Sequence, residues 1–172
     1  DKFVSADIPF LAHANGDAAA DLFIQALAKS LKDKKSKDHR SVMIHAQTVR
    51  DDQLDDMAAM NVIPSYFSAH TFYWGDWHRD SVLGLERGSR ISPTASSLAK
   101  GITFTVHNDA PIVPPDVMRL VWATSNRLTR SGKVLGSSER ISVEEALKAV
   151  TVNAAYQYFE EDRKGSIEVG KQ

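Results

Sequence analysis

The sequence predicts an α/β fold built from parallel βαβ units with the unit spacing of a (β/α)8 TIM barrel. Short apolar runs alternate along the 172 residues with segments of helical periodicity, the pattern of a parallel sheet with right-handed crossovers. Polar residues end three of these runs, and His13, His45 and Asp109 are separated by 32 and 64 residues. A (β/α)8 barrel uses roughly 31 residues for each unit, so the intervals match one unit and two units.

Four apolar runs are the predicted strands, at residues 8–13, 41–45, 61–67 and 102–106. Pro64 weakens the third prediction, because proline cannot donate to a strand ladder. The predicted helices are at residues 17–31, 51–60, 92–100, 115–126, 142–150 and 153–159. The segment between residues 68 and 88 is aromatic and irregular, and we expect a long loop there with short helical pieces.

Residue types near the helix ends predict how several helices begin. Asn15 or Asp17 would cap the first helix, and Pro93 would occupy the first turn of the helix at residues 92–100. Ser142 with Glu145 has the spacing of a capping box. Along residues 17–31 the apolar positions fall on one helical face, and these positions are Ala20, Phe23, Ile24, Leu27 and Leu31.

Composition excludes several classes of partner and site. The chain is 42% hydrophobic with a formal net charge of −1, and the lysine- and aspartate-rich stretch at residues 29–40 is typical of a solvated surface. We therefore expect no nucleic-acid partner. No apolar run approaches the roughly 18 residues of a membrane span, so no membrane partner is expected either. With no cysteine, neither a disulfide framework nor a thiolate metal site can form.

The three strand-ending polar residues together predict a metal site. Singly, His13 or His45 is more simply a packed or hydrogen-bonded histidine, and Asp109 suits a turn before Pro111. Jointly, two imidazoles and a carboxylate at the C-terminal ends of parallel strands are suitable ligands for zinc or a related divalent ion. The joint pattern favours the metal site.

Four segments carry a resemblance to a known family, and they are HANGD at residues 13–17, HAQ at 45–47, NDAP at 108–111 and the tail at 142–171. In order and spacing they are similar to the amidohydrolase superfamily, and within it to the branch of YtcJ-like proteins and N-substituted formamide deformylases. The resemblance covers nearly the whole chain.

The resemblance implies that the chain is about strands 5–8, the C-terminal portion, of a metal-dependent hydrolase (β/α)8 TIM barrel. In that barrel the metal ligands come from the first, fourth, fifth, sixth and eighth strands. His13 would be the fifth-strand ligand, His45 the sixth-strand ligand, and Asp109 the eighth-strand aspartate for one or two divalent metal ions, most simply zinc. The first-strand His-x-His and the fourth-strand bridging residue have no counterpart here. We therefore expect residues 1–172 to be a partial barrel domain whose open edges are covered by the N-terminal half or by self-association.

Two residues are the candidates for catalysis. Asp109 would take a proton from the attacking water and pass it to the leaving nitrogen. His70, which follows the third predicted strand, would donate a hydrogen bond to the developing oxyanion, although packing among loop aromatics explains it equally well. The aromatic residues 72–77 could line a substrate site or pack locally. His107 is a candidate for an outer hydrogen bond to the site, and His78 is a weaker candidate ligand.

These expectations predict a metal-dependent hydrolase of C–N bonds other than peptide bonds, with an amide, formamide or cyclic amide as its small-molecule substrate. The segment alone would be inactive. One alternative is an inactive regulatory or binding domain on the same scaffold, since fold does not establish activity. Another is a metal-containing barrel isomerase or lyase. A His-x-His at the end of a first strand would favour the hydrolase.

Overall fold

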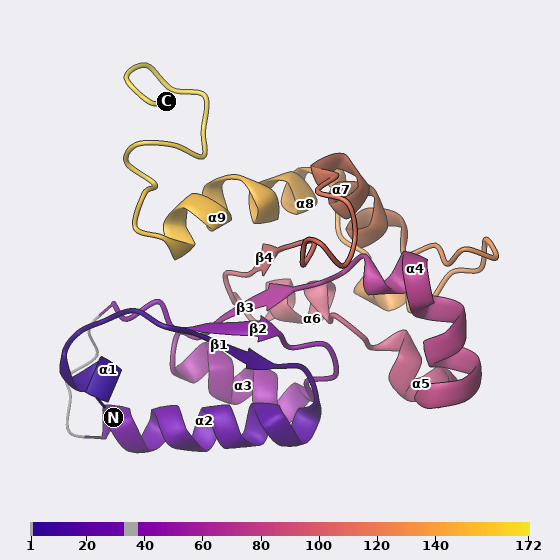
Figure 1. Ribbon diagram of the computed structural model, residues 1–172, viewed down its shortest axis with the longest axis horizontal. Helices are drawn as coiled ribbons and strands as arrows, with labels where there is room; N and C mark the ends of the chain where they lie inside the picture. The colour runs from indigo at the N-terminus through magenta and orange to yellow at the C-terminus, as the bar shows by residue number, and fades with distance from the viewer. Residues whose placement is uncertain (1, 33–37) are drawn as a thin grey trace.

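The computed structural model describes residues 2–32 and 38–172, and the strands among them form a single parallel sheet (Figure 1). Its strand order is β1-β2-β3-β4, which is also their order along the chain. The strands are β1 (Leu11–Ala14), β2 (Val42–His45), β3 (Ile63–Tyr66) and β4 (Thr105–Val106). The predicted α/β class and the sequential parallel order of a barrel segment are therefore confirmed. Pro64 does lie within β3, against the expectation that it would weaken this strand.

The strand register brings the C-terminal ends of the strands to one edge. Ala14 pairs with His45 and His45 pairs with Tyr66, while His107 N donates to Tyr66 O just beyond β4. Residues that follow the strands therefore emerge side by side, on the face where barrels carry their chemistry.

The described helices flank the sheet. In Figure 1, α2 and α3 lie below it and α8 and α9 lie above it. The longest, α2, buries Ala20, Ile24 and Leu27, as its periodicity predicts. The helices are α1 (Lys2–Ser5), α2 (Asp17–Leu31), α3 (Asp51–Ala59), α4 (His70–Trp77), the π-helix η1 (His78–Val82), α5 (Gly84–Ser89), α6 (Thr94–Ala99), α7 (Val117–Asn126), the 3-10 helix η2 (Ser137–Glu139), α8 (Val143–Val150) and α9 (Val152–Gln157).

The aromatic segment after β3 is far more helical than the sequence predicts. Residues 70–89 run through α4, η1 and α5 with few interruptions. Tertiary packing explains the difference, because Thr71 and Gly75 are buried one turn apart and a Cβ at Gly75 would lie only 2.8 Å from the Thr129 methyl group. These contacts stabilise helical structure in residues 70–89, although the apolar periodicity of this segment is weak.

Two of the predicted helix starts are wrong in detail. Gly16, and neither Asn15 nor Asp17, is the N-cap of α2, and no side chain caps this helix. Asp17 already lies in the first turn. The Asp17 N–H instead donates to Thr48 Oγ1 at 3.1 Å, so a neighbouring loop satisfies it. Pro93 is the N-cap of α6 and does not occupy its first turn.

The predicted capping box of α8 is half formed. Ser142 Oγ accepts a hydrogen bond of 3.1 Å from the Glu145 N–H, as expected of an N-cap serine. The Glu145 carboxylate accepts from Lys148 Nζ at 2.8 Å. The helix therefore has its N-cap, while the glutamate joins an ion pair along the helix surface.

Candidate functional site

Three potential metal ligands gather at the C-terminal edge of the sheet. They are His45, the last residue of β2, with His107 and Asp109, which follow β4. One ligand atom from each lies within 4.8 Å of those of the other two. His45 is buried, and the other two are partly exposed, so the group opens to solvent on one side.

The backbone at this edge is held in an unusual conformation. His45, Ala46 and Asp109 have φ angles of 75°, 47° and 52°, in the left-handed region that costs a residue with a Cβ roughly 1–2 kcal/mol. Such conformations persist where surrounding contacts enforce them, and they concentrate at functional sites. Here they turn the chain at the ends of β2 and β4, where the predicted site residues are.

His13 lies beside this group without belonging to the compact set of three. Its ring centroid is 4.6 Å from that of His45, with the rings edge to face, and its side chain is exposed at the free edge of β1. The structure thus places the three predicted residues His13, His45 and Asp109 at one edge. It adds His107, which the sequence suggested only as an outer hydrogen-bond partner.

The donor spacing fits a divalent metal ion. His107 Nε2 and His45 Nδ1 are 3.2 Å apart. Two ligands of a tetrahedral zinc with bonds of about 2.0 Å are separated by roughly 3.3 Å. Two imidazoles and one carboxylate are also a donor set that suits zinc.

Hydrogen bonds behind His107 orient its ring. His107 Nδ1 lies 3.0 Å from Ser65 Oγ, which lies 2.8 Å from Thr105 Oγ1, and Thr105 donates to Gln157 Oε1 at 2.7 Å. These contacts hold the His107 ring at Nδ1, so that its Nε2 faces His45, as the orientation of a metal ligand requires.

Burial keeps these imidazoles neutral near pH 7. It lowers the pKa of His107 to about 4, an effect that the neighbouring His45 increases and the Asp109 carboxylate opposes. Burial also lowers the pKa of His45, with Asp109 opposing and His13 adding to the shift. Neutral imidazole is the form that binds metal.

A second histidine pair lies next to the first. His70 Nδ1, at the start of α4, lies 3.2 Å from His78 Nε2 in η1, and the same His78 nitrogen lies 3.2 Å from Gln47 Nε2. Burial lowers the pKa of His70 to about 3, helped by the nearby His78, His45 and His107. The predicted catalytic residue His70 is therefore next to the first group.

The aromatic residues around His70 make two kinds of packing contact. The rings of Phe67 and Trp74 pack against His70, with centroids 4.6 and 4.9 Å from its own. Phe72 packs against Trp122 at 5.4 Å, which is local packing.

Sequence reasoning missed the link from Gln47 to His78. Its only signal was the position of Gln47 two residues after His45, at the end of the same strand.

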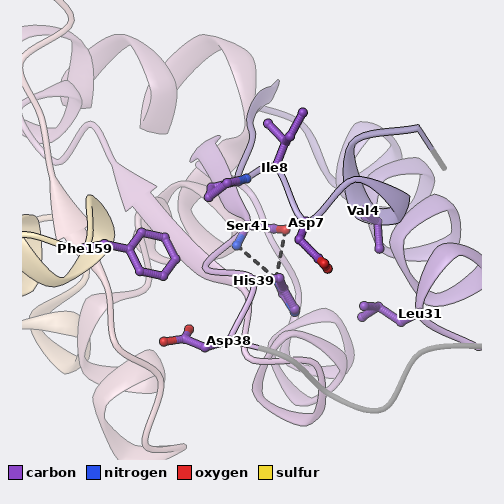
Figure 2. A pocket seen from close by; sticks show the side chains of 9 residues that line it. Val4, Asp7, Ile8, Leu31, Asp38, His39, Ser41 and Phe159 are labelled. Atoms are coloured by element: carbon purple, nitrogen blue, oxygen red, sulfur yellow. Dashed lines mark hydrogen bonds between the residues drawn. The ribbon is translucent and has the colours of Figure 1, made fainter.

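A cavity of about 280 Å³ lies away from these histidines (Figure 2). Its lining includes Ile8, before β1, and Ser41, before β2, so it adjoins the N-terminal ends of the strands. His39 in its wall is bonded to Ser41 Oγ at 2.8 Å and to Met60 O at 2.8 Å, and Figure 2 shows the first of these bonds. Both ring nitrogens of His39 are thus occupied, and the cavity shares no lining residue with the metal-ligand group.

Comparisons with known proteins show the family to which the chain belongs. A model of the amidohydrolase family matches residues 2–172. The chain is 25% identical over 164 residues to N-substituted formamide deformylase of Arthrobacter pascens and 27% identical over 164 residues to YtcJ of Bacillus subtilis, which is named as an amidohydrolase. Each alignment covers 92% of this chain but only 29% and 30% of the relative.

A solved structure shares the fold. An uncharacterised metal-dependent hydrolase of Pyrococcus horikoshii superposes with a TM-score of 0.80 at 24% identity, over 97% of this chain and 33% of that one. This chain therefore corresponds to about one third of that longer chain, and its parallel sheet is consistent with part of a TIM barrel. None of the helices in the described ranges 2–32 and 38–172 is long and apolar enough to cross a membrane. With the family model matching almost every residue, the chain belongs to the amidohydrolase family.

Proposed function

We propose that this chain supplies part of the active site of a metal-dependent hydrolase that cleaves C–N bonds other than peptide bonds, in an amide, formamide or cyclic amide. One observation carries the proposal: two imidazoles and a carboxylate converge at the C-terminal edge of a parallel sheet in a member of the amidohydrolase family. The name of the formamide deformylase relative supports the substrate class.

Each residue has a proposed role. His45 and Asp109 would hold one or two divalent ions, most simply zinc, together with His13 and His107. A divalent metal supplies a Lewis acid and lowers the pKa of water at the site. Asp109 would accept the proton of the attacking water and deliver it to the leaving nitrogen. His70 would donate a hydrogen bond to the developing oxyanion.

The activity is proposed for a protein longer than this segment, because the chain spans about 30% of the curated relatives' length. Residues 1–172 would form a partial barrel domain, with the first- and fourth-strand ligands supplied from outside it. The segment by itself would be inactive because it lacks those ligands.

Metal content tests the proposal first. We expect near-stoichiometric zinc by mass spectrometry in the intact protein supplied with zinc, and its loss in a His45→Ala variant. His39→Ala is the matched control, since His39 belongs to the cavity at the opposite ends of the strands. Zinc loss limited to His45→Ala supports the hydrolase and justifies a screen of amide substrates for amine release. If the intact protein supplied with zinc holds no metal, the hydrolase proposal is wrong, and an inactive binding domain on the same scaffold becomes the better explanation.

A further inference from the structure

His78 contacts both His70 and Gln47, and these contacts bear on which nitrogen of His70 carries its N–H proton. His78 Nε2 is shared between Gln47 and His70, at 3.2 Å from each, while its Nδ1 is buried without a hydrogen-bond partner. Both histidines are neutral near pH 7, because burial lowers the pKa of each. Each ring therefore carries one N–H proton, on either Nδ1 or Nε2, and these contacts favour one of the two positions.

One arrangement places the His78 proton on Nδ1. In it, the Gln47 amide nitrogen and His70 Nδ1–H both donate to His78 Nε2. A ring nitrogen has a single lone pair for these two donors. The buried Nδ1–H would also lack an acceptor, and orphaned buried N–H groups are rare. This arrangement is doubly unfavourable.

The other arrangement exchanges the nitrogen and oxygen of the Gln47 amide, which have nearly the same shape. His78 then carries its proton on Nε2 and shares it between Gln47 Oε1 and His70 Nδ1, a bifurcated bond of a common kind. The buried Nδ1 becomes a bare acceptor. In the described part of the chain, no other hydrogen bond of the Gln47 side chain opposes the exchange.

We propose that His78, fixed by Gln47, is a positioning residue that holds His70 with its proton on Nε2, ready to donate to the oxygen of a substrate carbonyl. With Nδ1 accepting from His78, His70 Nε2 is the free nitrogen, since it has no protein partner among the described residues. The rings of Phe67 and Trp74 hold the imidazole from two sides. His78 opens the π-helix η1, a rare element that is frequent at functional sites.

This inference rests on the proposed function for the role of His70, but the tautomer can be measured without any activity. We would record the ¹⁵N resonances of the imidazoles in the labelled chain at pH 7, with His70→Gln to assign His70. We expect the His70 proton on Nε2 in the wild type. His78→Leu should lose this preference, and His78→Gln should restore it, because the glutamine amide N–H can replace Nε2–H. A His70 proton on Nδ1 in the wild type would overturn the proposal.

Kinetics in the intact hydrolase provide the second readout. We expect His78→Leu to lower kcat by about 10- to 100-fold with KM nearly unchanged, as for a lost transition-state donor, and His78→Gln to recover most of it. An equal loss in both variants would overturn the positioning role. If the tautomer is as proposed but no amide is hydrolysed, the proposed function fails while the positioning of His70 stands.

Discussion

At the scale of single residues, the site combines neutral imidazoles with one carboxylate. His45 and His107 meet at 3.2 Å because β2 and β4 end at the same edge, and Asp109 follows two residues after His107. The hydroxyl of Ser65 holds the His107 ring from behind at 3.0 Å. In the proposed function the imidazole nitrogens bind the metal and Asp109 accepts the proton, and each of these roles can be tested by one substitution.

Asp109→Asn tests the proton transfer. In the intact protein we expect kcat to fall by about 10³-fold or more, because an amide cannot accept the proton of the attacking water, while most zinc is retained through the histidines. Asp116→Asn is the matched control, since that aspartate caps α7 and asparagine caps equally well. Unchanged kcat in Asp109→Asn would rule out the proton-transfer role.

The lowered pKa values predict a pH dependence of folding. Unfolded histidine has a pKa near 6.5, above the values of about 3 for His70 and about 4 for His107, so below pH 6.5 protons bind the unfolded chain preferentially. The free energy of unfolding therefore stays at its full value above pH 6.5 and decreases as the pH falls towards 4. At pH 5 the loss is at most about 2 kcal/mol for each histidine.

Urea unfolding with a chelator present, between pH 7 and 5, measures this loss. We expect His70→Phe to unfold with a smaller pH dependence than the wild type, because it removes one of the contributing groups. Equal pH dependence in the two proteins would contradict the neutral burial of His70.

At the scale of elements, close backbone packing fixes the segments that follow the site. Gly136 is the N-cap of η2 with φ 71°, and a Cβ there would lie 1.8 Å from Ser89 O at the end of α5. Arg127, fully buried, donates to Leu135 O at 2.8 Å and to Ile91 O at 2.7 Å. These contacts pack the end of α5, the start of η2 and the end of α7 against one another.

Gly136→Ala should therefore destabilise the chain by about 4 kcal/mol, as a severe backbone clash in a packed region does. Gly132→Ala is a matched control, because Gly132 also has a positive φ of 79° but nothing within 4 Å of an added Cβ. It should cost only about 1–2 kcal/mol, the strain of the left-handed backbone. Equal losses for both variants in urea unfolding would exclude the close contact at Gly136.

At the scale of the whole molecule, the sheet has an open edge. β1 pairs only with β2 in the part of the chain that the structure describes, and Leu11 on it is 44% exposed. Phe3 and Leu22 are also exposed beside it, around a groove between β1 and α2. An unpaired strand with apolar neighbours favours association with another chain segment.

We therefore expect the 172-residue chain by itself to self-associate in sedimentation, and Leu11→Lys to shift it towards the monomer. Leu85→Lys is the control, since Leu85 is exposed on α5 and does not line this groove. A stable wild-type monomer would contradict this expectation.

The sequence by itself determined the order of the parallel strands, the apolar face of α2 and the position of His13, His45 and Asp109 near the C-terminal ends of the strands. These follow from local periodicity and from the spacing of βαβ units, which do not depend on distant contacts. The tertiary structure alone decided that residues 70–89 are mostly helical and that His107 and Gln47 join the site. Those outcomes depend on contacts between residues far apart in the chain, such as Gly75 with Thr129 and His45 with His107, which no local pattern encodes.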